Sequence, residues 1–199
     1  MKRLLLLLLV ATIALNSTTT AQAQVDRNLT LKASAGLISL PDYINLLVVG
    51  LGSIDPKDNI SREDFTPCTA INLEMLHPIN HWMQIGASLS SGYASAQTIY
   101  NDTGALSRYI SSFHNSLCFL ANTTYWQKNN FAFYGSWGLG ATLFVVTQKD
   151  ADTNNTQATV APMGNIYPIC MKFGNLKGAY LELGWGAKGI VTIGGFINF

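Results

Sequence analysis

Charged side chains are scarce in this sequence of 199 residues. Aspartate, glutamate, lysine and arginine make up 12% of the chain, against roughly 25% in ordinary soluble domains. The formal net charge is only +1, while aromatic residues reach 11%. A chain this close to neutral lacks the basic surface that holds phosphates, so nucleic acid is not an expected partner. Part of its surface is expected to face something other than water.

Long apolar runs are also missing, except at the N-terminus. There, two basic residues precede an apolar run from Leu4 to Leu15, and small and polar residues follow as far as Ala23. This pattern predicts a signal peptide at residues 1–23, with residues 24–199 as one exported domain. No later run reaches the roughly 20 residues that a membrane helix needs. A closed β-barrel is then the backbone arrangement that remains able to span lipid.

The sequence does contain a regular alternation of apolar residues with polar or small ones, which predicts β-strands. Eight alternating segments lie at about 29–39, 68–76, 83–90, 108–125, 133–145, 167–173, 179–186 and 191–199. Their apolar side chains, Tyr167 included, occupy odd positions. This predicts an all-β fold, an eight-stranded antiparallel up-and-down transmembrane barrel with odd residues facing lipid and even residues facing the interior.

The connections between these segments favour the same fold. Short turns near 78, 128 and 175 alternate with longer links at about 40–66, 95–107 and 147–157. Outer-membrane barrels have short periplasmic turns and longer extracellular loops, so both termini are expected on the periplasmic side. Lipid-facing aromatic belts are then expected at the two rims, formed by Tyr125, Phe131, Phe173 and Phe199 and by Tyr93, Tyr109 and Trp185.

The alternative is a secreted soluble β-sandwich or a lipocalin-like barrel, in which the odd face is the core and the even face meets water. A solvent face of eight strands should be rich in lysine and glutamate. The even positions instead carry mostly glycine, serine, threonine and asparagine. This composition suits a packed polar interior better.

The last residues carry a family resemblance. The ending Val191-x-Ile193-x-Gly195-x-Ile197-x-Phe199, together with the strand count and the loop asymmetry, resembles the small outer-membrane barrels of the OmpA/OmpX/OmpW type. The resemblance covers nearly the whole exported part and implies location in the outer membrane of a Gram-negative bacterium. It also implies that Val191, Ile193, Ile197 and Phe199 form the signal for the barrel-assembly machinery, although Gly195 stands where a larger residue is usual.

An eight-stranded barrel has an interior that side chains can fill, so no open pore is expected. The polar residues expected to form this filling are Lys32, Glu74, Gln84, Arg108, Lys172 and Glu182. Lys32 and Glu74 should lie on neighbouring strands near the same end and can form an ion pair, since an unpaired buried charge is costly. A functional proton or ion path is the alternative to this structural role.

Candidate catalytic and metal-binding residues are few. His114, Ser116 and Cys118 share one face of a strand, but alternate residues lie roughly 6 to 7 Å apart, so a nucleophile and base in contact are not expected. His77 and His81 flank a turn close to Glu74, which is weak as a metal site. The chain is therefore expected to be no enzyme and to need no metal or cofactor.

The three cysteines, Cys68, Cys118 and Cys170, lie at even positions on strands that are not neighbours. Strands two apart are separated by roughly 9 to 10 Å, which exceeds the usual reach of a disulfide. No disulfide is expected.

The first long link is unusually apolar, with Pro41 near its start. Its apolar residues Ile44, Leu47, Val48 and Leu51 predict a short helix that either caps the barrel mouth or offers an apolar surface for lipid or a partner. The favoured function is that of an outer-membrane barrel with a structural role or a role in surface interaction through its outer loops. Passive transport or binding of small apolar molecules is the alternative, and a lipid-modifying enzyme comes third.

Overall fold

The computed structural model describes residues 29–41, 60–66, 69–100, 106–150 and 154–199. Its strands are β1 (Thr30–Leu37), β2 (Ile60–Thr66), β3 (Thr69–Pro78), β4 (Met83–Tyr100), β5 (Leu106–Lys128), β6 (Phe131–Asp150), β7 (Asn154–Gly174), β8 (Lys177–Trp185) and β9 (Val191–Asn198). In this part of the chain no helix is long and apolar enough to cross a membrane.

Eight of these strands form a closed antiparallel ring, which confirms the predicted all-β barrel. Around the ring the order is β4, β3, β1, β9, β8, β7, β6 and β5, and pairing between β5 and β4 closes it. The first and last strands of the ring, β1 and β9, pair along their whole length from Leu37↔Val191 to Thr30↔Asn198. This pairing leaves neither β1 nor β9 as an edge strand.

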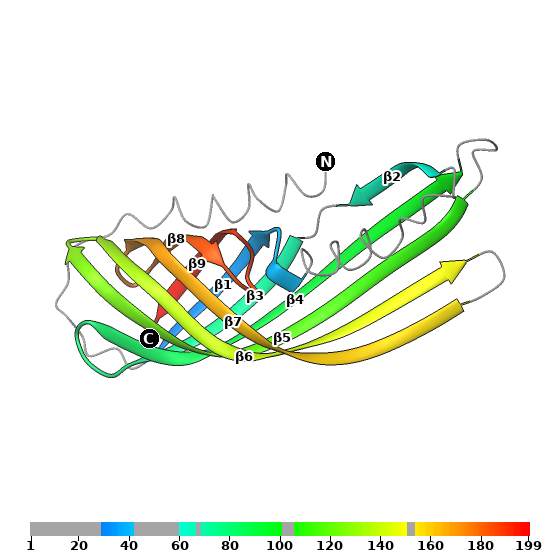
Figure 1. Ribbon diagram of the computed structural model, residues 1–199. Helices are drawn as coiled ribbons and strands as arrows, with labels where there is room; N and C mark the ends of the chain where they lie inside the picture. Colours follow the sequence, from blue (N-terminus) through cyan, green and yellow to red (C-terminus); the bar gives the residue numbers. More distant parts are fainter. Residues whose placement is uncertain (1–28, 42–59, 67–68, 101–105, 151–153) are drawn as a thin grey trace.

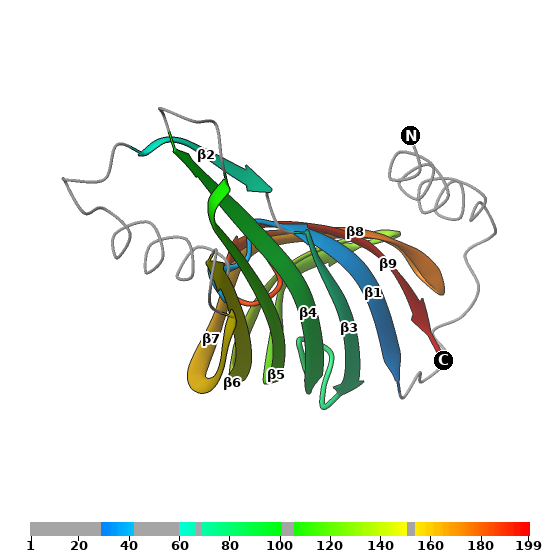
Figure 2. The same cartoon turned by 90° about the vertical axis from the view of Figure 1, so that its right-hand side faces the viewer.

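The strands differ greatly in length, which the sequence did not indicate. Strands β4 to β7 contain 18, 23, 20 and 21 residues, so they project well beyond the short strands β1, β3, β8 and β9 (Figures 1 and 2). In their described parts, the expected long links at 95–107 and 147–157 are thus strand, because their residues continue the antiparallel pairing.

The first long link differs from its prediction too. It contains a ninth strand, β2, which pairs with the projecting part of β4 from Ser95 to Tyr100 and lies outside the ring. The expected helix with Ile44, Leu47, Val48 and Leu51 falls in segment 42–59, outside the described residues.

The alternation of side chains around the ring follows the predicted parity over most of its length. Leu73, Phe119 and Leu139 lie on the outer face with 56%, 76% and 77% of their surface exposed. Their even-numbered neighbours, such as Asn72 and Cys118, are buried inside. The ring therefore has an apolar outer face and a largely polar interior.

Two bulges break this parity, one near the end of β5, after which the even-numbered Trp126 is 51% exposed, and one in β7. In β7, the pairing with β8 shifts between Ile166 and Ile169, so the strand carries a bulge there. A bulge adds one residue and reverses which side chains face inward. Before the bulge, the odd residues Met163, Asn165 and Tyr167 are buried while Ile166 is exposed. The expectation that Tyr167 faces outward is therefore wrong.

The residues expected in the aromatic belts all lie on the outer side of the ring. Tyr93, Tyr125, Phe173, Trp185 and Phe199 are 45% to 61% exposed, and Tyr109 and Phe131 are half-buried. Phe131 packs edge-on against Phe173 with ring centroids 5.0 Å apart, and the hydroxyls of Tyr93 and Tyr109 lie 2.8 Å apart. These pairs join neighbouring strands across the outer face.

The bulge in β7 allows a direct test of which side chains face inward and which face outward. In a variant with the native cysteines replaced by serine, Ile166→Cys should react readily with a membrane-permeant maleimide, whereas Tyr167→Cys should react poorly because it faces the packed interior. Leu117→Cys and Ser116→Cys form the matched pair without a bulge, and there the odd residue should react. Mass spectrometry measures the labelled fraction. Faster labelling at 167 than at 166 would contradict the parity reversal.

Candidate functional site

Four charged side chains meet in the barrel interior, and we call them the charge cluster: Lys32, Glu74, Glu182 and Lys188. The Nζ atom of Lys32 lies 2.8 Å from Oε1 of Glu182 and 3.4 Å from Oε2 of Glu74. Nζ of Lys188 lies 3.0 Å from Oε1 of Glu74 and also contacts Oε2 of Glu182. Each lysine thus contacts both glutamates, so positive and negative groups alternate, and the four formal charges sum to zero.

Strand register brings three members of the charge cluster together. Lys32 of β1 lies directly opposite Glu74 of β3, as the sequence predicted, and Glu182 reaches them from β8 on the other side of β9. All three occupy even positions and point inward. Their side chains are at most 2% exposed, so the pairs form away from water.

Lys188, the fourth member, was not predicted. It lies in the short link between β8 and β9, which turns back into the barrel mouth, where the backbone N–H of Ile190 donates to the carbonyl of Leu37. Gly189 permits this turn, because its φ is +112° and a Cβ there would lie 2.8 Å from backbone atoms of Leu37. One sign of this position is present in the sequence. Lys188 is surrounded by small residues, in a link between strands that is too short to form an exposed loop.

Tyrosine side chains surround the charge cluster. The hydroxyl of Tyr134 donates to Oε1 of Glu182 at 2.7 Å and accepts from Nζ of Lys32 at 3.0 Å. Lys32 also lies 4.5 Å from the ring centroid of Tyr180, and Lys188 lies 4.5 Å from that of Tyr167. Ring faces stabilise a cation where water is excluded. The bulge in β7 therefore supplies one of the aromatic walls by turning Tyr167 inward.

An apolar cluster lies in the same interior. It comprises Leu76, Cys118, Leu120, Phe144, Met163 and Ala187, with Leu40 packed against it. The charge cluster, the tyrosines and the apolar cluster are all buried in the barrel interior.

The other residues predicted to fill the interior do not join the charge cluster. Lys172 lies over the ring of Phe196, 4.1 Å from its centroid, with Oδ1 of Asn198 at 3.5 Å. Lys172 of β7 pairs with Tyr180 of β8, whereas Glu182 pairs with Cys170, two residues further along each strand. The amide of Gln84 donates to the hydroxyl of Thr30 at 3.4 Å. Arg108 belongs to β5, but its side chain lies outside the described part.

The candidate catalytic residues are buried and bonded elsewhere. The Ser116 hydroxyl lies 2.6 Å from that of Thr142 on β6, and Nε2 of His114 lies 3.4 Å from the hydroxyl of Ser39. Cys118 packs in the apolar cluster. The structure therefore does not bring His114, Ser116 and Cys118 together as a nucleophile and its base.

Neither cysteine in the described part of the chain forms a disulfide. Cys118 and Cys170 are both free and buried, and Cys68 lies outside the described part. His77 and His81 are exposed at the β3–β4 turn, whereas Glu74 points into the charge cluster. No group of three or more potential metal ligands occurs within the described ranges.

The residues of the expected assembly signal lie along β9. Ile193, Ile197 and Phe199 are 49%, 51% and 61% exposed on the outer face, and Val191 is half-buried. The backbone N–H of Phe199 donates to the carbonyl of Leu29, which fastens the end of the chain to the start of β1. Recognition by an assembly machinery remains a prediction.

Comparison with known proteins adds no family to this description. Neither the protein-family models nor the curated protein sequences searched contain a match to the chain. The resemblance to small outer-membrane barrels therefore stays a prediction.

The charge cluster predicts a large effect of removing one charge. Lys188→Met should lower the free energy of unfolding by about 3–5 kcal/mol, because it leaves Glu74 and Glu182 buried with one lysine between them. Lys128→Met, at an exposed turn, should change it by no more than about 0.5 kcal/mol. Urea unfolding in detergent, followed by tryptophan fluorescence, measures both. Equal effects of the two substitutions would show that the charge cluster does not hold the fold.

Proposed function

We propose that this protein is an outer-membrane β-barrel without an open pore that acts at the cell surface through its projecting strands. The observation that carries the proposal is the distribution of side chains, with leucine, isoleucine and phenylalanine outside and paired charges inside. In water, so large an apolar outer face would be an aggregation hazard. In a lipid bilayer the same face matches its surroundings, and the interior keeps the polar groups from the acyl chains.

The projecting part of β4 to β7 supports a role in surface interaction. It continues the sheet beyond the ring, and the residues of β7 from Asn154 to Val160 are exposed. Between Asn154 and Pro162, β7 pairs with β6 alone among the described strands, because its pairing with β8 begins at Ile166. We call this stretch the free edge. Its backbone groups are available to a further strand.

Natural proteins usually protect such an edge with charged residues. The free edge contains none, and Pro162 is its single proline. An extended segment of another protein can add to such an edge through main-chain hydrogen bonds, which is an established mode of peptide recognition. The partner expected on these grounds is therefore a protein that offers an extended, largely uncharged strand.

The location can be tested by inserting epitope tags at the two ends of the molecule. A tag between Asp150 and Asn154 should bind antibody on intact bacteria, because β6 ends and β7 begins at the projecting end (Figure 1). A tag between Asn129 and Asn130, in the β5–β6 turn at the other end, should bind only after the outer membrane is permeabilised. Both tags hidden in intact cells, or the reverse pattern, would contradict the proposed orientation.

The free edge can be tested with matched charge substitutions. Thr156→Lys with Ala158→Lys places two charges on β7, whereas Thr147→Lys with Val145→Lys places them on the same rungs of β6, a strand already paired on both sides. The first variant should bind an immobilised peptide of alternating threonine and valine several-fold more weakly than wild type. The second should bind it nearly as well. Surface plasmon resonance measures both, and equal loss in the two variants would refute recognition by the free edge.

A further inference from the structure

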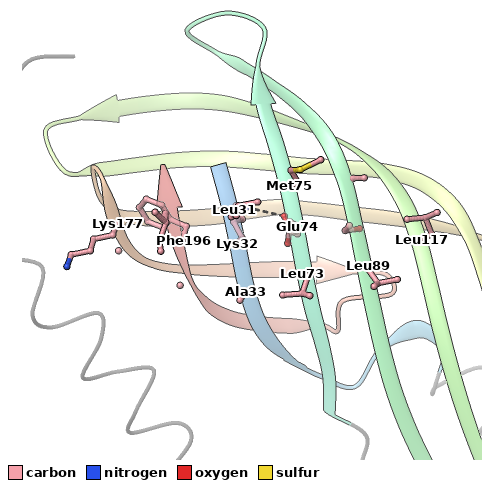
Figure 3. Close-up of a pocket in the computed structure, with 15 residues that line it drawn as sticks. Leu31, Lys32, Ala33, Leu73, Glu74, Met75, Leu89, Leu117, Lys177 and Phe196 are labelled. Atoms are coloured by element: carbon pink, nitrogen blue, oxygen red, sulfur yellow. Dashed lines mark ion pairs between the residues drawn. The ribbon is translucent and has the colours of Figure 1, made fainter. Parts of the chain in front are cut away.

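A groove of about 670 Å³ crosses the outer face of the ring (Figure 3). It runs from the start of β8 across β9, β1 and β3 to β4 and β5, and it is lined almost entirely by apolar atoms. Its volume falls in the range of roughly 300–1,000 Å³ that is usual for small-molecule sites. Lys32 and Glu74 of the charge cluster are also among its lining residues, but their side chains are at most 2% exposed and pair in the interior.

Small residues produce this groove. Ala33 of β1 lies opposite Gly195 of β9, so two neighbouring outward positions carry almost no side chain. Leu31, Leu73 and Met75, all more than 40% exposed, surround the depression. Ala87 on β4, directly opposite Met75, continues it. An apolar chain lying there would contact atoms on its floor and on both sides, which gives more dispersion energy than a flat surface does.

One end of the groove carries a charge. Lys177 is the first residue of β8 and follows the β7–β8 turn at the end of the barrel that holds the C-terminus. Figure 3 shows its carbon stem at the groove and its amine directed away from it. Lysines commonly place an apolar stem along an apolar surface and their amine at the water boundary. The groove therefore joins an apolar surface to a cation at one rim. Glu74, the acidic residue among the described lining residues, is paired with Lys32 and Lys188 in the interior.

We propose that the groove binds one acyl chain of an anionic glycerophospholipid, with the lipid phosphate beside the amine of Lys177. The inference rests on the proposed membrane location. Strands of such barrels tilt by roughly 35–45° from the barrel axis, so a groove that crosses them from the rim rises obliquely into the hydrocarbon layer. The lipid phosphate then lies at the charged end of the groove, and the acyl chain lies along its apolar part. A zwitterionic lipid would fit the groove equally well but would gain less electrostatic stabilisation from Lys177.

Gly195 offers a way to fill the groove without disturbing the backbone. A Cβ at this position would meet its nearest atom, the carbonyl oxygen of Gly178, at 3.5 Å, which is an ordinary contact. Gly195→Leu would therefore place a side chain where the acyl chain is proposed to lie. Gly164→Leu is the matched control, because a Cβ there has no neighbour nearer than 4.0 Å. Gly164 faces outward on β7, opposite Leu139 and away from the groove.

The experiment measures lipid retention by native mass spectrometry after reconstitution into nanodiscs of equal phosphatidylglycerol and phosphatidylcholine. Wild type and Gly164→Leu should retain one phosphatidylglycerol in clear preference to phosphatidylcholine, and Gly195→Leu should retain neither. Lys177→Gln should reduce the preference for phosphatidylglycerol about fivefold, as expected for one lysine near an anionic surface. Lys128→Gln, a lysine at a neighbouring turn of the same rim, should leave it unchanged.

The outcomes separate the groove from the membrane location. If wild type fails to insert into the nanodiscs, the proposed location is wrong and the lipid site with it. If it inserts but retains both lipids equally, or if Gly195→Leu retains lipid like Gly164→Leu, the groove is not a lipid site and the location stands. Dimers that form with wild type and vanish with Gly195→Leu, without retained lipid, would assign the groove to a second copy of the chain and overturn the proposal.

Discussion

The alternating contacts of Lys32, Glu74, Lys188 and Glu182 are the interaction on which the interior depends. Each lysine contacts both glutamates, and the four side chains come from β1, β3, β8 and the link before β9. Burial of any one of these charges alone would be strongly unfavourable, so the group is stable only when complete. Its geometry fixes which residues of neighbouring strands face each other and draws the β8–β9 link into the barrel mouth.

This constraint connects the interior to the outer face. Because the charges point inward at even positions, the intervening leucines and isoleucines must point outward, and a shift of one residue would reverse both sets. The bulge in β7 produces such a reversal within one strand, and it lets Tyr167 face Lys188 while Ile166 remains outside. The small residues Ala33 and Gly195 lie on the same outer face, where they leave the groove rather than a continuous apolar ridge.

Much of this arrangement follows from the sequence, because period-2 alternation determines both strand and face. The eight-stranded ring and the contact between Lys32 and Glu74 were predicted in this way. Lys188 was not, since its position depends on how a short link folds in three dimensions. Nor were Tyr167 and the projecting strands, because a bulge leaves no mark in the alternation and polar strand residues resemble a loop. Strand β2 was missed for the same reason.

Magnetisation transfer in solid-state NMR, with the protein in lipid bilayers, tests most directly whether a sealed charged interior lies within a lipid-facing wall. Acyl-chain protons should transfer to the side chains of Leu73, Leu117 and Ile193, and neither acyl-chain nor bulk-water protons should transfer rapidly to the amine of Lys188. Rapid transfer from bulk water to the three outward side chains and to Lys188 alike, with none from lipid, would contradict both the membrane location and the sealed interior.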